Sequence, residues 1–164
     1  MSDILRYAIS ITFLLSAYLI SSGYSSYASA RLSEYTAYLK LFTHVEWALT
    51  TRAATVKAWC LGFTEPTLEK LGLLPLLREG ASVKDAYKGS EARSRMSQRG
   101  KELLGEYFSE YGRGYLDGEL KKLRTARGAL EDILKTEGEE LTRSVRTLRA
   151  LLFALALGGV ILVI

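Results

Sequence analysis

The sequence predicts an all-α protein in which a helical bundle lies between an N-terminal and a C-terminal transmembrane helix. Three observations lead to this prediction. Apolar residues make up 48 % of the 164 residues and are concentrated at the two ends of the chain. Between the ends, apolar positions recur at spacings of three and four, the period of an amphipathic helix. No stretch alternates apolar and polar residues over the length of a strand, so a sheet is not expected.

Composition excludes several classes of protein. The net charge of +4 and the pI near 9.2 are mild compared with those of a dedicated nucleic-acid-binding protein. Cys60 is the only cysteine, so the chain has no intramolecular disulfide framework. His44 is the only histidine, which leaves too few of the usual ligands for a zinc site.

The first apolar segment predicts a membrane anchor over residues 1–30. Residues 7–30 carry no charge, and about 20 apolar residues are enough for a helix to span a bilayer. A secretory signal peptide is the alternative, because residues 28–30, Ala-Ser-Ala, have the small-residue form of a cleavage site. An uncleaved anchor is favoured, since Asp3 offsets Arg6 and little positive charge remains near the N-terminus.

The middle of the chain, residues 31–148, is predicted to be the helical bundle. Apolar residues keep helical spacing over residues 31–50, so the first helix should continue beyond the anchor. A second helix is expected over residues 53–61, closed by Gly62. Pro66 suits the first turn of a short third helix.

Glycine, proline and serine predict the next helix boundaries. Gly72, Pro75 and Gly80 should divide the stretch that follows into short pieces. Ser82, with Asp85 three residues later, predicts a capped helix that ends before Gly89. Residues 90–100 are polar and basic and predict a loop or an exposed helix start, and residues 103–111 carry an apolar stripe that belongs to a core.

The last third of the chain predicts one long helix. Leucines at spacings of three, four or seven begin at Leu116, with charged residues on the other face. Residues 150–164 carry no charge, and no proline interrupts the stretch, so we expect the helix to be continuous across Arg149. Residues 149–164 are predicted to be the second transmembrane segment, although about 15 residues are short for a hydrocarbon core of about 30 Å. A buried core helix is the alternative.

Basic residues next to the two spans predict the topology. Arg31 follows the first span, and Arg143, Arg146 and Arg149 precede the second. The positive-inside rule therefore places the bundle in the cytoplasm and both termini on the far side of the membrane. The three arginines at spacing three share one side of the helix, which suits phospholipid headgroups. A solvated helix face with an excess of arginine is the alternative.

No motif predicts catalysis. Residues 112–118 resemble a glycine-rich phosphate loop, but no strand precedes them, so we interpret them as a tight turn between helices. Arg113, Gly114 and Asp117 are the candidate partner contacts in this turn. His44 is expected at a surface or interface and Cys60 in the core. We expect no catalytic residue, no cofactor and no metal, and the acidic residues after Ala129 are interpreted as a solvated face with ion pairs.

The order of these features resembles the stage III sporulation protein AB family. The shared features are the N-terminal span, the helical middle, a Gly-x-x-Asp turn at residues 114–117, and a charged helix that enters a short terminal span with glycines. The resemblance covers most of the chain and is clearest over residues 114–164. The chain departs from the family at Arg113, where a leucine is usual, and at residues 51–54, which lack the family's proline.

The resemblance implies a non-enzymatic platform in the secretion-like channel complex that joins mother cell and forespore in endospore-forming bacteria. Proteins of this family are similar to the inner-membrane platform protein of type II secretion. The implied location is the mother-cell membrane facing the forespore. The implied partners are a cytoplasmic secretion-type ATPase, other membrane subunits and membrane lipid, with no nucleic acid and no small-molecule substrate. The alternative is a two-span membrane sensor or a coiled-coil dimerisation module, since the leucines from Leu116 to Val145 are near-heptad for part of their length.

Overall fold

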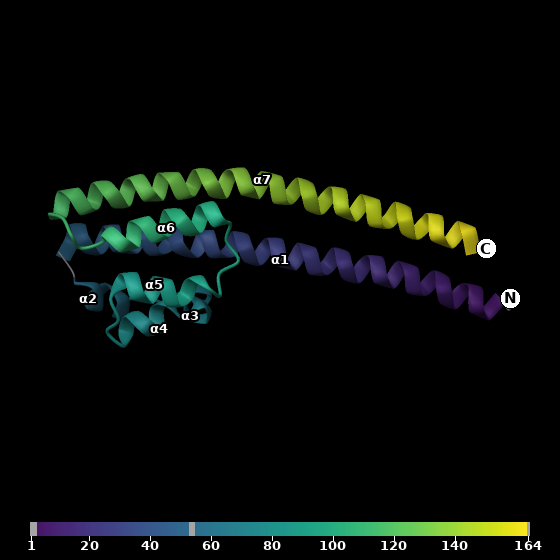
Figure 1. Ribbon diagram of the computed structural model, residues 1–164, viewed down its shortest axis with the longest axis horizontal. Helices are drawn as coiled ribbons and strands as arrows, with labels where there is room; N and C mark the ends of the chain where they lie inside the picture. Colours follow the sequence, from purple (N-terminus) through teal and green to yellow (C-terminus); the bar gives the residue numbers. More distant parts are fainter. Residues whose placement is uncertain (1–2, 53–54, 164) are drawn as a thin grey trace. The chain divides into compact units, whose positions relative to one another are not determined.

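The computed structural model describes residues 3–52 and 55–163, and over these residues the chain is all-helical, with no strand. This confirms the predicted all-α class. The helices are α1 (Asp3–Arg52), α2 (Val56–Leu61), α3 (Pro66–Leu71), α4 (Leu73–Arg78), α5 (Val83–Glu91), α6 (Gln98–Glu110) and α7 (Leu116–Val163) (Figure 1).

The two long helices agree with the sequence prediction. Helix α1 has 50 residues, so the apolar N-terminal segment does continue into the middle of the chain. Helix α7 has 48 residues and is continuous across Arg149. Helix α2 is described from Val56 and is followed by Gly62 as its C-cap. The first two residues predicted for it, 53 and 54, lie outside the described residues.

The short helices follow the predicted signals with two differences. Pro66 occupies the first turn of α3, and Gly72 separates α3 from α4 with a φ of 87°. Pro75, however, lies inside α4 and does not break it, because in a first turn the missing N–H has no acceptor within the helix. Ser82 caps α5 as predicted, but α5 continues through Gly89 to Glu91. A Cβ atom at Gly89 would lie 2.9 Å from Cδ1 of Leu76, so this glycine permits close packing of α4 and α5.

The polar stretch over residues 90–100 is less exposed than predicted. Ser90 is fully buried, and its hydroxyl donates to the carbonyl oxygen of Tyr87 at 2.8 Å. Helix α6 begins after Ser97, whose side-chain oxygen accepts a hydrogen bond from the backbone N–H of Gly100 at 3.2 Å. The stretch therefore contains a helix end, a short loop and a capped helix start.

The chain forms two compact units, one of Met1–Ala30 with Glu137–Ile164 and one of Arg31–Thr136. Helices α1 and α7 contribute residues to both. The predicted division into residues 1–30, 31–148 and 149–164 refers to the edges of a membrane, which this clustering does not test, and it stays a prediction.

The first unit contains the apolar ends of α1 and α7. Within the described residues, these are the two helices long and apolar enough to cross a membrane. Only 6 % of the most apolar stretch of each is buried, and large side chains such as Leu15 and Leu155 are exposed. An apolar surface that protein does not cover is typical of a membrane span and does not fit the alternative of a buried core helix.

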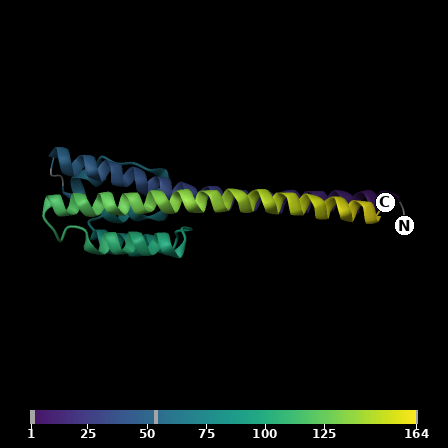
Figure 2. The same cartoon turned by 90° about the horizontal axis from the view of Figure 1, so that it is seen from above.

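The second unit is built on an aromatic core. Tyr35, Tyr38 and Phe42 of α1 are each at most 1 % exposed. The ring centroids of Phe42 and Tyr107 lie 4.9 Å apart with their planes at 66°, an edge-to-face contact that stabilises more than its buried area alone. Helix α6 supplies Tyr107, and α7 adds Leu123 and Leu130, both fully buried. In both views, the beginning of α7 lies beside α6 and the end of α1 (Figures 1 and 2).

Two glycine substitutions test this packing. Gly100→Ala would place a Cβ atom 2.6 Å from Oη of Tyr35, which is fully buried, so we expect a loss of about 1–3 kcal/mol of stability. Gly128→Ala, inside α7, meets nothing within 4 Å, and should raise stability by about 0.5–1 kcal/mol through helix propensity. Unfolding of the full chain in detergent, followed by circular dichroism, measures both. Equal effects of the two substitutions would contradict the packing described here.

Candidate functional site: the surface around the α6–α7 turn

The turn between α6 and α7 brings the three predicted contact residues together. Gly112 adopts a φ of 78°, a conformation that favours glycine. Arg113 and Gly114 lie in the turn, Asp117 lies in the first turn of α7, and all three are exposed. An acidic residue in this position is favourable because the N-terminus of a helix carries partial positive charge. Contact of these residues with a partner stays a prediction.

Glu119 fixes the shape of this turn. Its side chain is only 6 % exposed, and its Oε1 accepts a hydrogen bond from the backbone N–H of Gly114 at 3.0 Å. A Cβ atom on Gly114 would lie 3.1 Å from the same oxygen, so a larger residue there would require the Glu119 carboxylate to shift. Glu119 was not predicted to hold the turn. Its position within the first turn of a long helix was the available signal.

A groove lies between α6 and α7, close to the turn. Its volume is about 320 Å³, its floor is mainly apolar, and its rim carries charges of both signs. Nζ of Lys122 and Oε2 of Glu110 form an ion pair at 3.0 Å across it. Burial raises the pKa of Tyr107, which also lines the groove, so its hydroxyl stays protonated. The full lining is Leu103, Glu106, Tyr107, Glu110, Lys121, Lys122, Thr125, Ala126 and Ala129. An apolar floor with a charged rim is the usual composition of a protein-binding surface.

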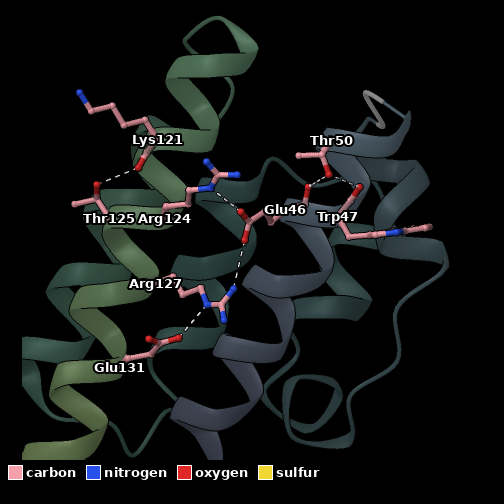
Figure 3. Close-up of polar contacts among 8 residues, drawn as sticks. All are labelled: Glu46, Trp47, Thr50, Lys121, Arg124, Thr125, Arg127 and Glu131. Atoms are coloured by element: carbon pink, nitrogen blue, oxygen red, sulfur yellow. Dashed lines mark hydrogen bonds and ion pairs between the residues drawn. The ribbon is translucent and has the colours of Figure 1, made fainter.

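A network of four charged residues joins α7 to α1 within the second unit (Figure 3). Nε of Arg124 donates to Oε1 of Glu46 at 2.6 Å, and Nη1 of Arg127 donates to Oε2 of Glu46 at 3.3 Å. Arg127 also pairs with Glu131, one turn further along α7, at 2.9 Å. Glu46 therefore holds two arginines that lie about 80 residues away in sequence. The two arginines were not predicted to contact α1.

A buried carboxylate holds the loop before α6. Glu34 of α1 is 5 % exposed, and its Oε2 accepts hydrogen bonds from Oγ of Ser94 at 2.7 Å and from the backbone N–H of Arg95 at 2.9 Å. Next to it, Oη of Tyr35 accepts from the backbone N–H of Ser97 at 3.1 Å. These bonds attach the start of α6 to α1. A buried polar group lowers the stability of the fold unless it is hydrogen-bonded. These bonds therefore favour one position of the loop, the one in which each group has its partner.

His44 and Cys60 have structural contacts. The ring of His44 lies 4.9 Å from that of Phe63, and its Nε2 lies 3.0 Å from the carbonyl oxygen of Trp59. Cys60 is fully buried, as expected, and burial raises the pKa of its thiol, so it is a poor nucleophile. Nε1 of Trp59 donates to Oη of Tyr111 at 3.3 Å, which connects α2 to the end of α6. Within the described ranges, no three His, Cys, Asp or Glu residues form a group that could hold a metal ion.

The basic residues predicted to flank the membrane are placed on both long helices. Arg31 is half-buried on α1 in the second unit, whereas Arg143, Arg146 and Arg149 are exposed on α7 in the first. Nε of Arg149 makes a long hydrogen bond of 3.4 Å to Oγ of Ser21. The side of the membrane on which these residues lie stays a prediction.

Comparison with known proteins adds no relative: no protein-family model, no curated protein and no solved structure matches the chain.

Removing the Glu46 carboxylate tests the network between α1 and α7. Glu46→Gln should lower the stability of the chain by about 1 kcal/mol, because two partly exposed arginines lose their shared partner. The matched control is Glu131→Gln, which removes only a pair within α7 and should cost about 0.3–0.5 kcal/mol. Both losses, measured by denaturant unfolding, should shrink at 1 M salt, where the Debye length is about 3 Å. A loss for Glu46→Gln no larger than that for Glu131→Gln would show that the network does not hold α7 in place.

Proposed function

We propose that the protein is a non-enzymatic platform in a membrane complex, held by two spans with its helical unit in the cytoplasm. The observation that carries this proposal is the pair of long helices whose apolar ends are left uncovered by protein. Both helices continue without a break into residues of the second unit. A protein built in this way would hold a helical docking unit next to a membrane.

The resemblance to the stage III sporulation protein AB family makes the proposal more specific. The complex would be the secretion-like channel between mother cell and forespore, and the helical unit would dock a cytoplasmic secretion-type ATPase. The turn at Arg113, Gly114 and Asp117 is exposed and lies close to the charged rim of the α6–α7 groove. These features support the turn and groove as the surface to test for docking.

The alternative, a coiled-coil dimerisation module, has less support. It requires the leucine series of α7 to face a second chain. Leu123 and Leu130 are fully buried in the core of the second unit, together with Ala126 and Ile133. Over residues 123–133, the seam that would pair two chains is therefore already covered within one chain, whereas Leu116 at the start of the series is 44 % exposed.

Accessibility of tags to protease tests the proposed topology. In intact spheroplasts of a non-sporulating host that expresses the chain, added protease should remove tags from both termini and leave a tag inserted after Gly112 intact until the cells are lysed. The reason is the excess of arginine on the central side of each span. A terminal tag that is protected until lysis would overturn the two-span arrangement.

Charge reversal at the turn tests ATPase docking. The double variant Arg113→Glu with Asp117→Lys keeps the net charge and should weaken binding of the secretion-type ATPase of the same organism about tenfold or more, since like charges then face the partner. Binding is measured with the full chain in lipid nanodiscs. The matched control, Lys88→Glu with Glu79→Lys, reverses two exposed charges outside the turn and should bind as the wild type does. A folded wild-type protein that does not bind the ATPase would overturn this part of the proposal.

A further inference from the structure

The first unit contains a polar pocket between its two apolar helices. The pocket has a volume of about 510 Å³ and lies where the serine-rich part of α1 faces Arg149 of α7. No acidic residue lines it; the lining is Tyr18, Ser21, Ser22, Ser25, Ser26, Arg149 and Phe153. Four serine hydroxyls, the hydroxyl of Tyr18 and one guanidinium therefore line the same space, together with the ring of Phe153.

The serine hydroxyls of the pocket differ from other hydroxyls of α1. Thr12, Ser16 and Thr36 each donate to the carbonyl oxygen four residues earlier, at 2.8 to 3.1 Å, as hydroxyls in helices commonly do. For Ser22, Ser25 and Ser26 the described part of the chain offers no such bond, and the Ser21 hydroxyl has only the long contact to Arg149. The pocket therefore keeps its hydroxyl donors available for a ligand.

Arg149 brings an uncompensated positive charge to the pocket. Among the described residues, no carboxylate lies within the 4.0 Å of an ion pair, and the hydrogen bond to Ser21, at 3.4 Å, is weak. A guanidinium presents several N–H donors in one plane, a geometry that matches phosphate oxygens. Surrounding hydroxyl donors would complete the coordination of such an anion.

We propose that this pocket binds the phosphate group of an anionic phospholipid. The hydroxyl and guanidinium donors suit a phosphate anion, which a phospholipid headgroup and free inorganic phosphate both supply. The surroundings favour a lipid, because Tyr18 and Phe153 are 65 % and 53 % exposed, and Leu15 and Leu155, one turn or less away, are also exposed. Acyl chains attached to the phosphate would cover this apolar surface. The proposal depends on the membrane insertion proposed above, but not on the ATPase.

Lipid binding by the full chain in uncharged detergent tests the proposal. In native mass spectrometry with phosphatidylglycerol, the wild type should retain one lipid tightly, and Arg149→Gln should weaken this binding about tenfold, because it removes the charged donor. The matched control is Arg143→Gln, which removes an exposed arginine of the same helix outside the pocket and should change binding less than twofold. If Arg149→Gln and Arg143→Gln lose equal amounts of phosphatidylglycerol binding, the proposed pocket is overturned, because the lipid is then held by general attraction between charges.

Variants of the pocket serines test the contribution of the hydroxyl groups to lipid binding separately from that of the Arg149 charge. Ser22→Ala with Ser25→Ala should weaken phosphatidylglycerol binding about threefold, while the control Ser16→Ala with Ser29→Ala, outside the pocket, should leave it unchanged. Arg149→Lys should recover part of the binding, because it keeps the charge and loses the planar donors. Circular dichroism of each variant confirms that it is folded.

Two outcomes separate this proposal from its alternatives. Millimolar inorganic phosphate should not displace the lipid, and displacement would overturn the assignment to a phospholipid. If the chain inserts into membranes but Arg149→Gln binds phosphatidylglycerol as the wild type does, this inference alone fails. If the wild-type chain does not insert into membranes at all, the proposed function fails first.

Discussion

Burial of one aromatic face of α1 is the constraint on which the second unit depends. Tyr35, Tyr38 and Phe42 repeat at helical spacing, so a straight helix presents them on one side, and each is almost fully buried. Helices α5 and α6 cover that side with Tyr87 and Phe108, whose ring centroids lie 5.1 Å apart. The loop before α6 and the first turns of α7 are positioned in turn by contacts with these helices and with α1. Protein interiors are densely packed, so the shape of this face of α1 limits how α5, α6 and the first turns of α7 can be arranged.

Local patterns in the sequence were enough to predict most helices but not all of their ends. The capping serine at position 82, Pro66 in a first turn and the continuity of α7 across Arg149 follow from short-range rules. The expectation that Gly89 ends a helix was wrong. Gly89 lies inside α5, where its missing Cβ atom leaves room for Leu76 of α4. Such a contact depends on tertiary packing, which the spacing of residues in one segment does not contain.

The polar contacts of the second unit were harder to predict than its helices. Arg113, Gly114 and Asp117 could be assigned to a turn because glycines cluster there. By contrast, Glu34 and Glu46 lie within a helix among apolar residues, and their partners are 60 to 81 residues away in sequence. Composition and periodicity predict which side of a helix is apolar, but they do not indicate which charged groups will meet after folding.

The position of Cys60 has a practical consequence for spectroscopy. It is the only cysteine in the chain, it is fully buried, and its Sγ lies 3.8 Å from the carbonyl oxygen of Leu74 in α4. A thiol-specific dye or spin label has no access to a side chain of this kind while the protein is folded. The natural sequence therefore already serves as an unlabelled background. A single cysteine introduced at an exposed position of α7 would carry the only probe, so distances and motions could be followed without first removing a native thiol.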